Sequence, residues 1–167
     1  MTHQPFRSQK GLALKAQKGF TLIELLVVIG ILAILLAITL IAINPARQFA
    51  QANNTKRSSD VNAILNAIGQ YQADNSGALP AGMPVAGAAA TEVSDAGADI
   101  CALLVTQYIA QLPVDPLTNG GTAIAATCPA GYATGYFVAV GAGDNRVTVS
   151  APATEIPPAT VDIEVTR

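Results

Sequence analysis

The stretch Lys18-Gly19-Phe20-Thr21-Leu22-Ile23-Glu24 opens the longest apolar run of this 167-residue chain. After Glu24, residues 25–43 carry no charge, and only Gly30 and Thr39 interrupt them. As a helix, this run would be roughly 28 Å long, which suits the hydrocarbon core of a bilayer, about 30 Å thick. An ionisable side chain at membrane depth is costly, so Glu24 is a candidate functional residue.

Basic residues precede this apolar run and no acid lies among them: Arg7, Lys10, Lys15 and Lys18. This asymmetry favours an N-terminus in the cytoplasm. A conventional secretory signal would be cleaved after its apolar region and removed. Here the cleavable-looking junction Gly19-Phe20 lies ahead of the run, so cleavage would keep the membrane helix. The alternative is an uncleaved signal anchor, with Glu24 merely near the interface.

Gly19, Phe20 and Glu24 together resemble the class III leader of bacterial type IV prepilins and pseudopilins. The resemblance implies cleavage after Gly19 by a prepilin peptidase and methylation of the new Phe20 amine. It also implies assembly from the inner membrane, by a platform and an ATPase, into a homo-oligomeric helical filament. In that filament Glu24 would meet the Phe20 amine of a neighbouring subunit, whereas the alternative is a pair within one helix.

The pattern divides the chain into four parts. Residues 1–19 are the expected leader, 20–43 the transmembrane and assembly half of a long helix, 44–76 its amphipathic half, and 77–167 a globular head. Pro45 interrupts the helix because proline lacks an amide donor and crowds the preceding turn. We expect a continuous helix kinked at Pro45, with the alternative that one helix ends and another begins there.

Residues 46–74 read as a helix with one apolar stripe at three- and four-residue spacing. The stripe consists of Val61, Ile64, Leu65, Ile68 and Tyr71. Gly77 is a candidate left-handed cap after the helix end. The run Tyr71 to Pro80 resembles the end of the long N-terminal helix in many pilins.

The head pattern predicts an α+β fold in which the long helix packs on a small antiparallel sheet. Residues 81–98 read as a loop, and a short helix follows Asp99, which can cap it, through Tyr108 or Ala110. The element Leu112-Pro113-Val114-Asp115-Pro116 resembles one that precedes the sheet in the type IV pilin family. Strands are expected at residues 132–140, 146–150 and 160–165.

Cys101 and Cys128 lie on the exported side of the span, where an oxidising environment favours a disulfide. Two free buried thiols and a metal site are the alternatives. A structural zinc site needs more ligands, and the chain has a single histidine, His3, within the leader. Asp95, Asp99 and Asp115 are weak candidates for calcium by residue type, but they form no dense ligand ladder.

Charge and residue usage argue against two function classes. Four of the nine basic residues lie before Gly19 and none of the eleven acids does, so the chain from Phe20 onward has a formal charge of −6. Such an acidic chain shows no basic patch of the kind that binds nucleic acid. Catalysis has no support either, because the exported part has no histidine to serve a nucleophile as base.

Three functions stay open at this point. The resemblance favours a structural pilin of a type IV pilus that serves adhesion, motility or DNA uptake and becomes an extracellular filament. A pseudopilin of a type II secretion system is the first alternative, and such pseudopilins often bind calcium. A monomeric membrane-anchored binding domain is the second, and it predicts neither filaments nor leader cleavage.

Overall fold

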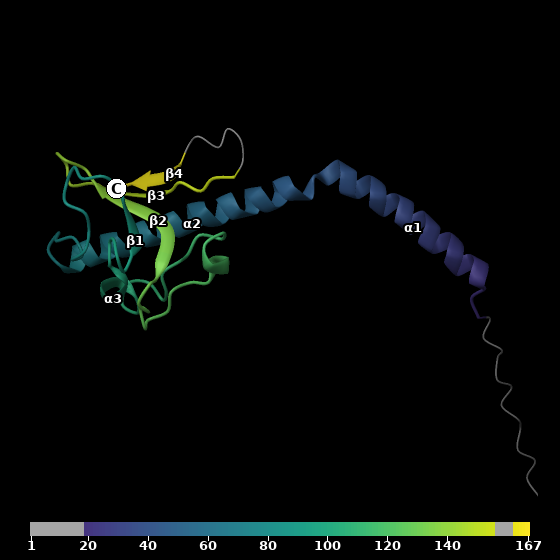
Figure 1. Ribbon diagram of the computed structural model, residues 1–167, viewed down its shortest axis with the longest axis horizontal. Helices are drawn as coiled ribbons and strands as arrows, with labels where there is room; N and C mark the ends of the chain where they lie inside the picture. Colours follow the sequence, from purple (N-terminus) through teal and green to yellow (C-terminus); the bar gives the residue numbers. More distant parts are fainter. Residues whose placement is uncertain (1–18, 156–161) are drawn as a thin grey trace, which may run out of the picture. The chain divides into compact units, whose positions relative to one another are not determined.

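The computed structural model describes residues 19–155 and 162–167, so all but the last residue of the expected leader lies outside it. The described chain forms two compact units, of which the first ends at Ile43 and the second spans Asn44–Arg167. Each unit is built on one of the two long helices drawn in Figure 1. The fold is α+β, as the sequence predicts.

The first unit contains helix α1, Leu22–Ile43, which is 22 residues long and has a mean hydropathy of 3.3 over an 18-residue window. No residue of α1 is buried. By length and composition α1 can cross a membrane. A helix that is apolar all round needs a lipid or protein environment on every side.

The second unit starts at a break in the helix rather than at a kink. Asn44 has φ 46° and ψ 78°, a left-handed conformation, and its side chain accepts a hydrogen bond from the Arg47 amide at 3.3 Å. Pro45 then begins helix α2, Pro45–Asp74. The expected continuous helix through Pro45 is therefore wrong. Asparagine tolerates the left-handed region and caps well, while proline suits the first helical position, so the two residues together favour a new start.

Helix α2 buries the predicted apolar stripe against the sheet. Val61, Ile64, Leu65 and Ile68 are buried, and Tyr71 packs at the margin of the core. The helix ends at Asp74 with Asn75 as its C-cap, and Gly77 follows in the left-handed conformation that was predicted for it.

Four antiparallel strands form the sheet in the order β1-β2-β3-β4. Their bounds are β1 Thr91–Ser94, β2 Ala133–Val140, β3 Val147–Ala151 and β4 Ile163–Thr166. Strands β3 and β4 lie against α2 (Figure 1). Two of the expected strands, β2 and β3, lie within one or two residues of their predicted bounds. The first positions of the third expected strand, residues 160 and 161, fall outside the described residues.

Two sequence expectations in the head are corrected. Strand β1 lies inside the segment expected to be a loop, because pairing with β2 and burial of Val93 outweigh its small, polar composition. Helix α3, Cys101–Leu104, is shorter than predicted, since Val105 is already extended. Asp99 does not cap this helix; Ile100 holds the cap position and makes no side-chain cap bond. A short 3-10 turn, η1, spans Asn119–Gly121.

Candidate assembly site

The apolar helix α1 begins with a reciprocal cap between Thr21 and Glu24. The Thr21 amide and hydroxyl each donate to Glu24 Oε2 at 2.7 Å, and the Glu24 amide donates to Thr21 Oγ1 at 3.3 Å. This is the capping-box arrangement, with threonine at the cap and glutamate three residues later. It satisfies backbone donors that the start of a helix otherwise leaves unpaired.

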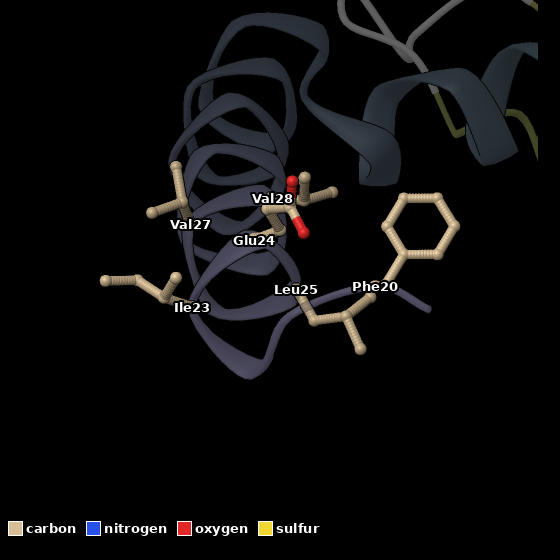
Figure 2. Close-up of a pocket in the computed structure, with 6 residues that line it drawn as sticks. All are labelled: Phe20, Ile23, Glu24, Leu25, Val27 and Val28. Atoms are coloured by element: carbon tan, nitrogen blue, oxygen red, sulfur yellow. The ribbon is translucent and has the colours of Figure 1, made fainter. Parts of the chain in front are cut away.

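The Glu24 carboxylate stands in an apolar setting. Phe20, Ile23, Leu25, Val27 and Val28 surround it and line a shallow groove on the helix surface. In the view of Figure 2, the carboxylate projects from the side of the helix that carries Phe20 and Leu25. Within the described chain, Glu24 Oε1 has no hydrogen-bond partner, so one carboxylate oxygen stays open to a cation from outside.

The junction between Gly19 and Phe20 lies just outside the helix. Both residues are exposed and non-helical, two positions before α1 begins. An added Cβ at Gly19 would meet no atom within 4 Å. The folded chain itself therefore does not require glycine at this position, so any requirement comes from whatever binds the junction. In the unprocessed chain the Phe20 nitrogen is part of a peptide bond, so Phe20 has no free amine that could form an ion pair with Glu24.

Comparison with known proteins agrees with this geometry. A profile described as the prokaryotic N-terminal methylation motif matches residues 14–40, which include the junction, the cap and most of α1. This match supports the class III leader of type IV pilins and pseudopilins that the sequence predicts. No match was found among curated proteins or among solved structures.

The leader motif supports a pilin or pseudopilin, a kind of protein anchored in the membrane by its N-terminal helix and processed by a prepilin peptidase. The exposed, uniformly apolar α1 has the properties that such an anchor needs.

The head is covalently closed by one disulfide, and its cysteines are those predicted. Cys101 at the start of α3 is bonded to Cys128, and their Cα atoms are 5.9 Å apart. Cys101 is fully buried in the core beside Leu104. The bond thus ties α3 to the segment that leads into β2. The alternatives of free thiols and a metal site do not apply to this pair.

A buried ion-pair network, which the sequence reasoning missed, joins α2 to the rest of the head. Arg57 is 0% exposed, and its Nε and Nη2 donate to Asp115 at 2.5 and 3.1 Å. Arg57 Nη1 also donates to Asn54 and to Glu155, at 2.8 and 2.9 Å. The network holds two segments against α2: the Leu-Pro-x-Asp-Pro element and the chain that leaves β3.

The charges of this network reinforce each other. Burial by itself would raise the pKa of Asp115, but hydrogen bonds from Arg57 and the Leu117 amide, with the charges of Arg57 and Lys56, hold it below the usual range. The hydrogen bond to Asp115 raises the pKa of Arg57 in turn. Both groups are therefore ionised at neutral pH. One signal could have revealed Arg57: it lies four residues before Val61, on the same stripe of α2.

A second polar group lies beside this network. Lys56 donates to Asp60 at 3.0 Å and to the Val114 carbonyl at 2.9 Å, and the Tyr136 hydroxyl donates to Asp60 at 2.7 Å. Burial, followed by the hydrogen bond to Asp60, raises the pKa of Tyr136. Tyr136 therefore stays protonated and serves as a donor from β2 to α2.

The three calcium candidates are each held by protein groups. Asp115 pairs with Arg57, Asp99 accepts from the Tyr132 hydroxyl at 2.7 Å, and Asp95 accepts from the Gly131 amide. Among the residues that the structure describes, no group of three or more acidic, histidine or cysteine side chains is arranged to hold a metal. Calcium binding stays an untested prediction from the sequence.

Proposed function

We propose that this protein is a pilin of a type IV pilus, exported through the inner membrane and assembled into an extracellular filament of many copies. The observation that carries the proposal is α1 itself. It is 22 residues long, apolar and fully exposed, and it bears one carboxylate at its start, directly behind the leader junction. A bundle of such helices in a filament would give each copy the apolar surroundings that a single chain lacks.

In this bundle, Glu24 would fix the axial position of each helix relative to its neighbour, that is, the register of the bundle. After cleavage, the Phe20 amine of one copy would be a cation, and the open oxygen of Glu24 in the next copy would accept from it. At about 4 Å and an effective dielectric near 20, such a contact is worth about 4 kcal/mol before desolvation. Burying both ions offsets much of this gain, so the pair would select register more than it adds affinity. The remaining surface of α1 is uniformly aliphatic and offers little register of its own.

The chain would need several assembly partners. A prepilin peptidase, an assembly platform and an ATPase would act on the chain, and the filament would serve adhesion, motility or DNA uptake. We propose a structural subunit without catalytic activity and without a required cofactor. The acidic head makes direct DNA binding by the described surface unfavourable.

A pseudopilin of a type II secretion system is the second candidate. Two features favour the pilus: the disulfide that closes the head, and the hydrogen bonds that protein groups donate to Asp95, Asp99 and Asp115. A calcium-dependent head would gain thermal stability when calcium is added. We expect no change in melting temperature between calcium and a chelator.

Filaments sheared from the cell surface provide the test. The expected result is that they contain this subunit, and that deleting its gene removes them while secretion of exoproteins continues. Lost secretion with no surface filaments in the parent strain would support the pseudopilin. An unprocessed subunit in the membrane, with no filaments under any condition, would support the monomeric anchored domain.

A further inference from the structure

The first two turns of α2 are uncovered by the part of the head that the structure describes. We call residues 45–52 the neck; all of them are exposed apart from the half-buried Ala50. Further along α2, Asn53 donates to Glu155 at 2.8 Å. The neck is therefore a surface that assembly could cover.

Two neck side chains suit a protein partner. Phe49 is 71% exposed and is the one large apolar residue of the neck. Arg47 is exposed two positions earlier, on a different side of the helix from Phe49, and no ion pair or side-chain hydrogen bond engages it within the described residues. Aromatic residues and arginine are enriched at protein interfaces.

A complementary surface lies on strand β4. This strand is at the edge of the sheet, with β3 as its one hydrogen-bonded neighbour. Ile163 and Val165 pack against the core, while Asp162 and Glu164 are exposed. Neither carboxylate has an ion-pair partner in the part of the chain that the structure describes.

The charges of the two regions are opposite. Residues 45–59 contain three cations and no acid, whereas residues 77–167 contain eight acids and two cations. Lys56 and Arg57 are already paired within their own chain. Arg47 is therefore the cation of this region that is left for a second molecule.

Positions along α2 indicate how two copies would meet. Asn54 contacts Glu155 in the chain that leaves β3, and Asn66 contacts Arg167 after β4, so β4 lies alongside the helix between these levels. At 1.5 Å per residue, Arg47 lies about 10 Å before Asn54 and about 28 Å before Asn66. A second copy shifted along the helix axis by about 10–28 Å would bring its neck beside β4.

We propose that the neck of one copy, through Arg47, docks against the β4 edge of the next copy at Asp162 and Glu164. The contact joins different surfaces of two identical chains, which produces an open helical filament. This inference rests on the proposed filament and adds a head-level contact to the one made by α1. The neck follows α1 closely along the chain, since α1, the assembly helix, ends one residue before Asn44.

A charge exchange in the full-length protein tests this contact. Arg47→Glu and Glu164→Arg, made singly, should each lower the yield of sheared filaments at least about tenfold, because like charges then face each other. The double variant should restore most of the yield. Arg146→Glu, at an exposed position in the turn after β2, makes the same charge change and should leave the yield unchanged.

The outcomes separate this inference from the proposed function. If the parent protein forms no filaments, the proposed function fails. If filaments form and the double variant is no better than the singles, or Arg146→Glu is equally damaging, the docking contact is refuted. If Arg47→Glu instead lowers the amount of processed subunit in the membrane, the neck acts on lipid headgroups and the proposal is likewise overturned.

Discussion

At the scale of single residues, Glu24 has two roles that can be separated. In the single chain its carboxylate caps α1 through Thr21, and in the proposed filament it accepts from a neighbouring amine. Capping requires a local acceptor, whereas the second role requires a negative charge that is accessible from outside. The cap contributes roughly 1 kcal/mol to the stability of α1. This is small compared with the stabilisation that the apolar interior of a membrane gives to an apolar helix.

We predict that Glu24→Val abolishes filaments while leader cleavage and membrane insertion continue. Loss of the cap removes little of the stability of a 22-residue apolar helix, but loss of the charge removes the register contact. Filament yield by electron microscopy, measured beside the level of processed subunit, checks this. Thr39→Val in the same helix is a matched control, since its hydroxyl bonds only to the Leu36 carbonyl. Normal filaments in Glu24→Val would exclude the carboxylate as an assembly contact.

Arg57 and Asp115 form the other residue-scale feature. We predict that Asp115→Asn destabilises the head by about 3–5 kcal/mol, because it leaves Arg57 buried with less negative charge around it. Lys56→Met, which removes a partly exposed pair, should cost about 1 kcal/mol or less. Urea unfolding of the detergent-purified protein measures both. Equal effects of the two variants would contradict the assignment of the buried pair.

The same pair gives the head a defined response to acid. Since the folded state lowers the pKa of Asp115, its contribution is present above the unfolded pKa of about 3.9 and is lost as the pH falls through the folded value. The parent should therefore lose stability below about pH 4, and Asp115→Asn should show a flatter dependence there.

At the scale of elements, the disulfide fastens the shortest helix. Helix α3 has four residues and no side-chain cap, so its position depends on burial and on the bond between Cys101 and Cys128. The segment between the two cysteines includes the Leu-Pro-x-Asp-Pro element that Arg57 holds. A covalent bond and a buried ion pair thus secure the same part of the head.

We predict that Cys101→Ser/Cys128→Ser lowers the free energy of unfolding by about 3.6 kcal/mol, the value that loop closure gives in the chain-entropy model. Peptide mapping without reduction should recover the two cysteines as one linked pair. Two thiols that alkylate before reduction would contradict the bond. Adding a reductant to the parent should reproduce the loss and leave the double variant unchanged.

At the scale of the whole molecule, the chain separates into an anchor that needs partners and a head that packs on its own. The unit ending at Ile43 has no buried residue in its described part, while Asn44–Arg167 contains the core. The left-handed Asn44 and Pro45 mark the change from one to the other. Processing acts on the first unit and need not disturb the second.

We predict cleavage between Gly19 and Phe20 and methylation of the new amine. The junction is exposed and lies outside the helix, so a protease can bind it as extended chain. Mass spectrometry of the subunit from sheared filaments should show a methylated Phe20 at the N-terminus. Gly19→Val should block processing while leaving the head folded, because a Cβ at Gly19 would meet no atom of the described chain within 4 Å. An intact leader on surface protein would refute the cleavage.

The sequence by itself determined the features that depend on local pattern. The leader, the apolar α1, the stripe of α2, the strands β2 and β3 and the cysteine pair follow from spacing, hydropathy and redox setting, which act over a few residues. The tertiary structure alone decided the rest. Strand β1 exists because β2 offers it an edge, and Arg57 is buried because Asp115, distant in sequence, neutralises it. Each of these depends on partners that no short window of sequence contains.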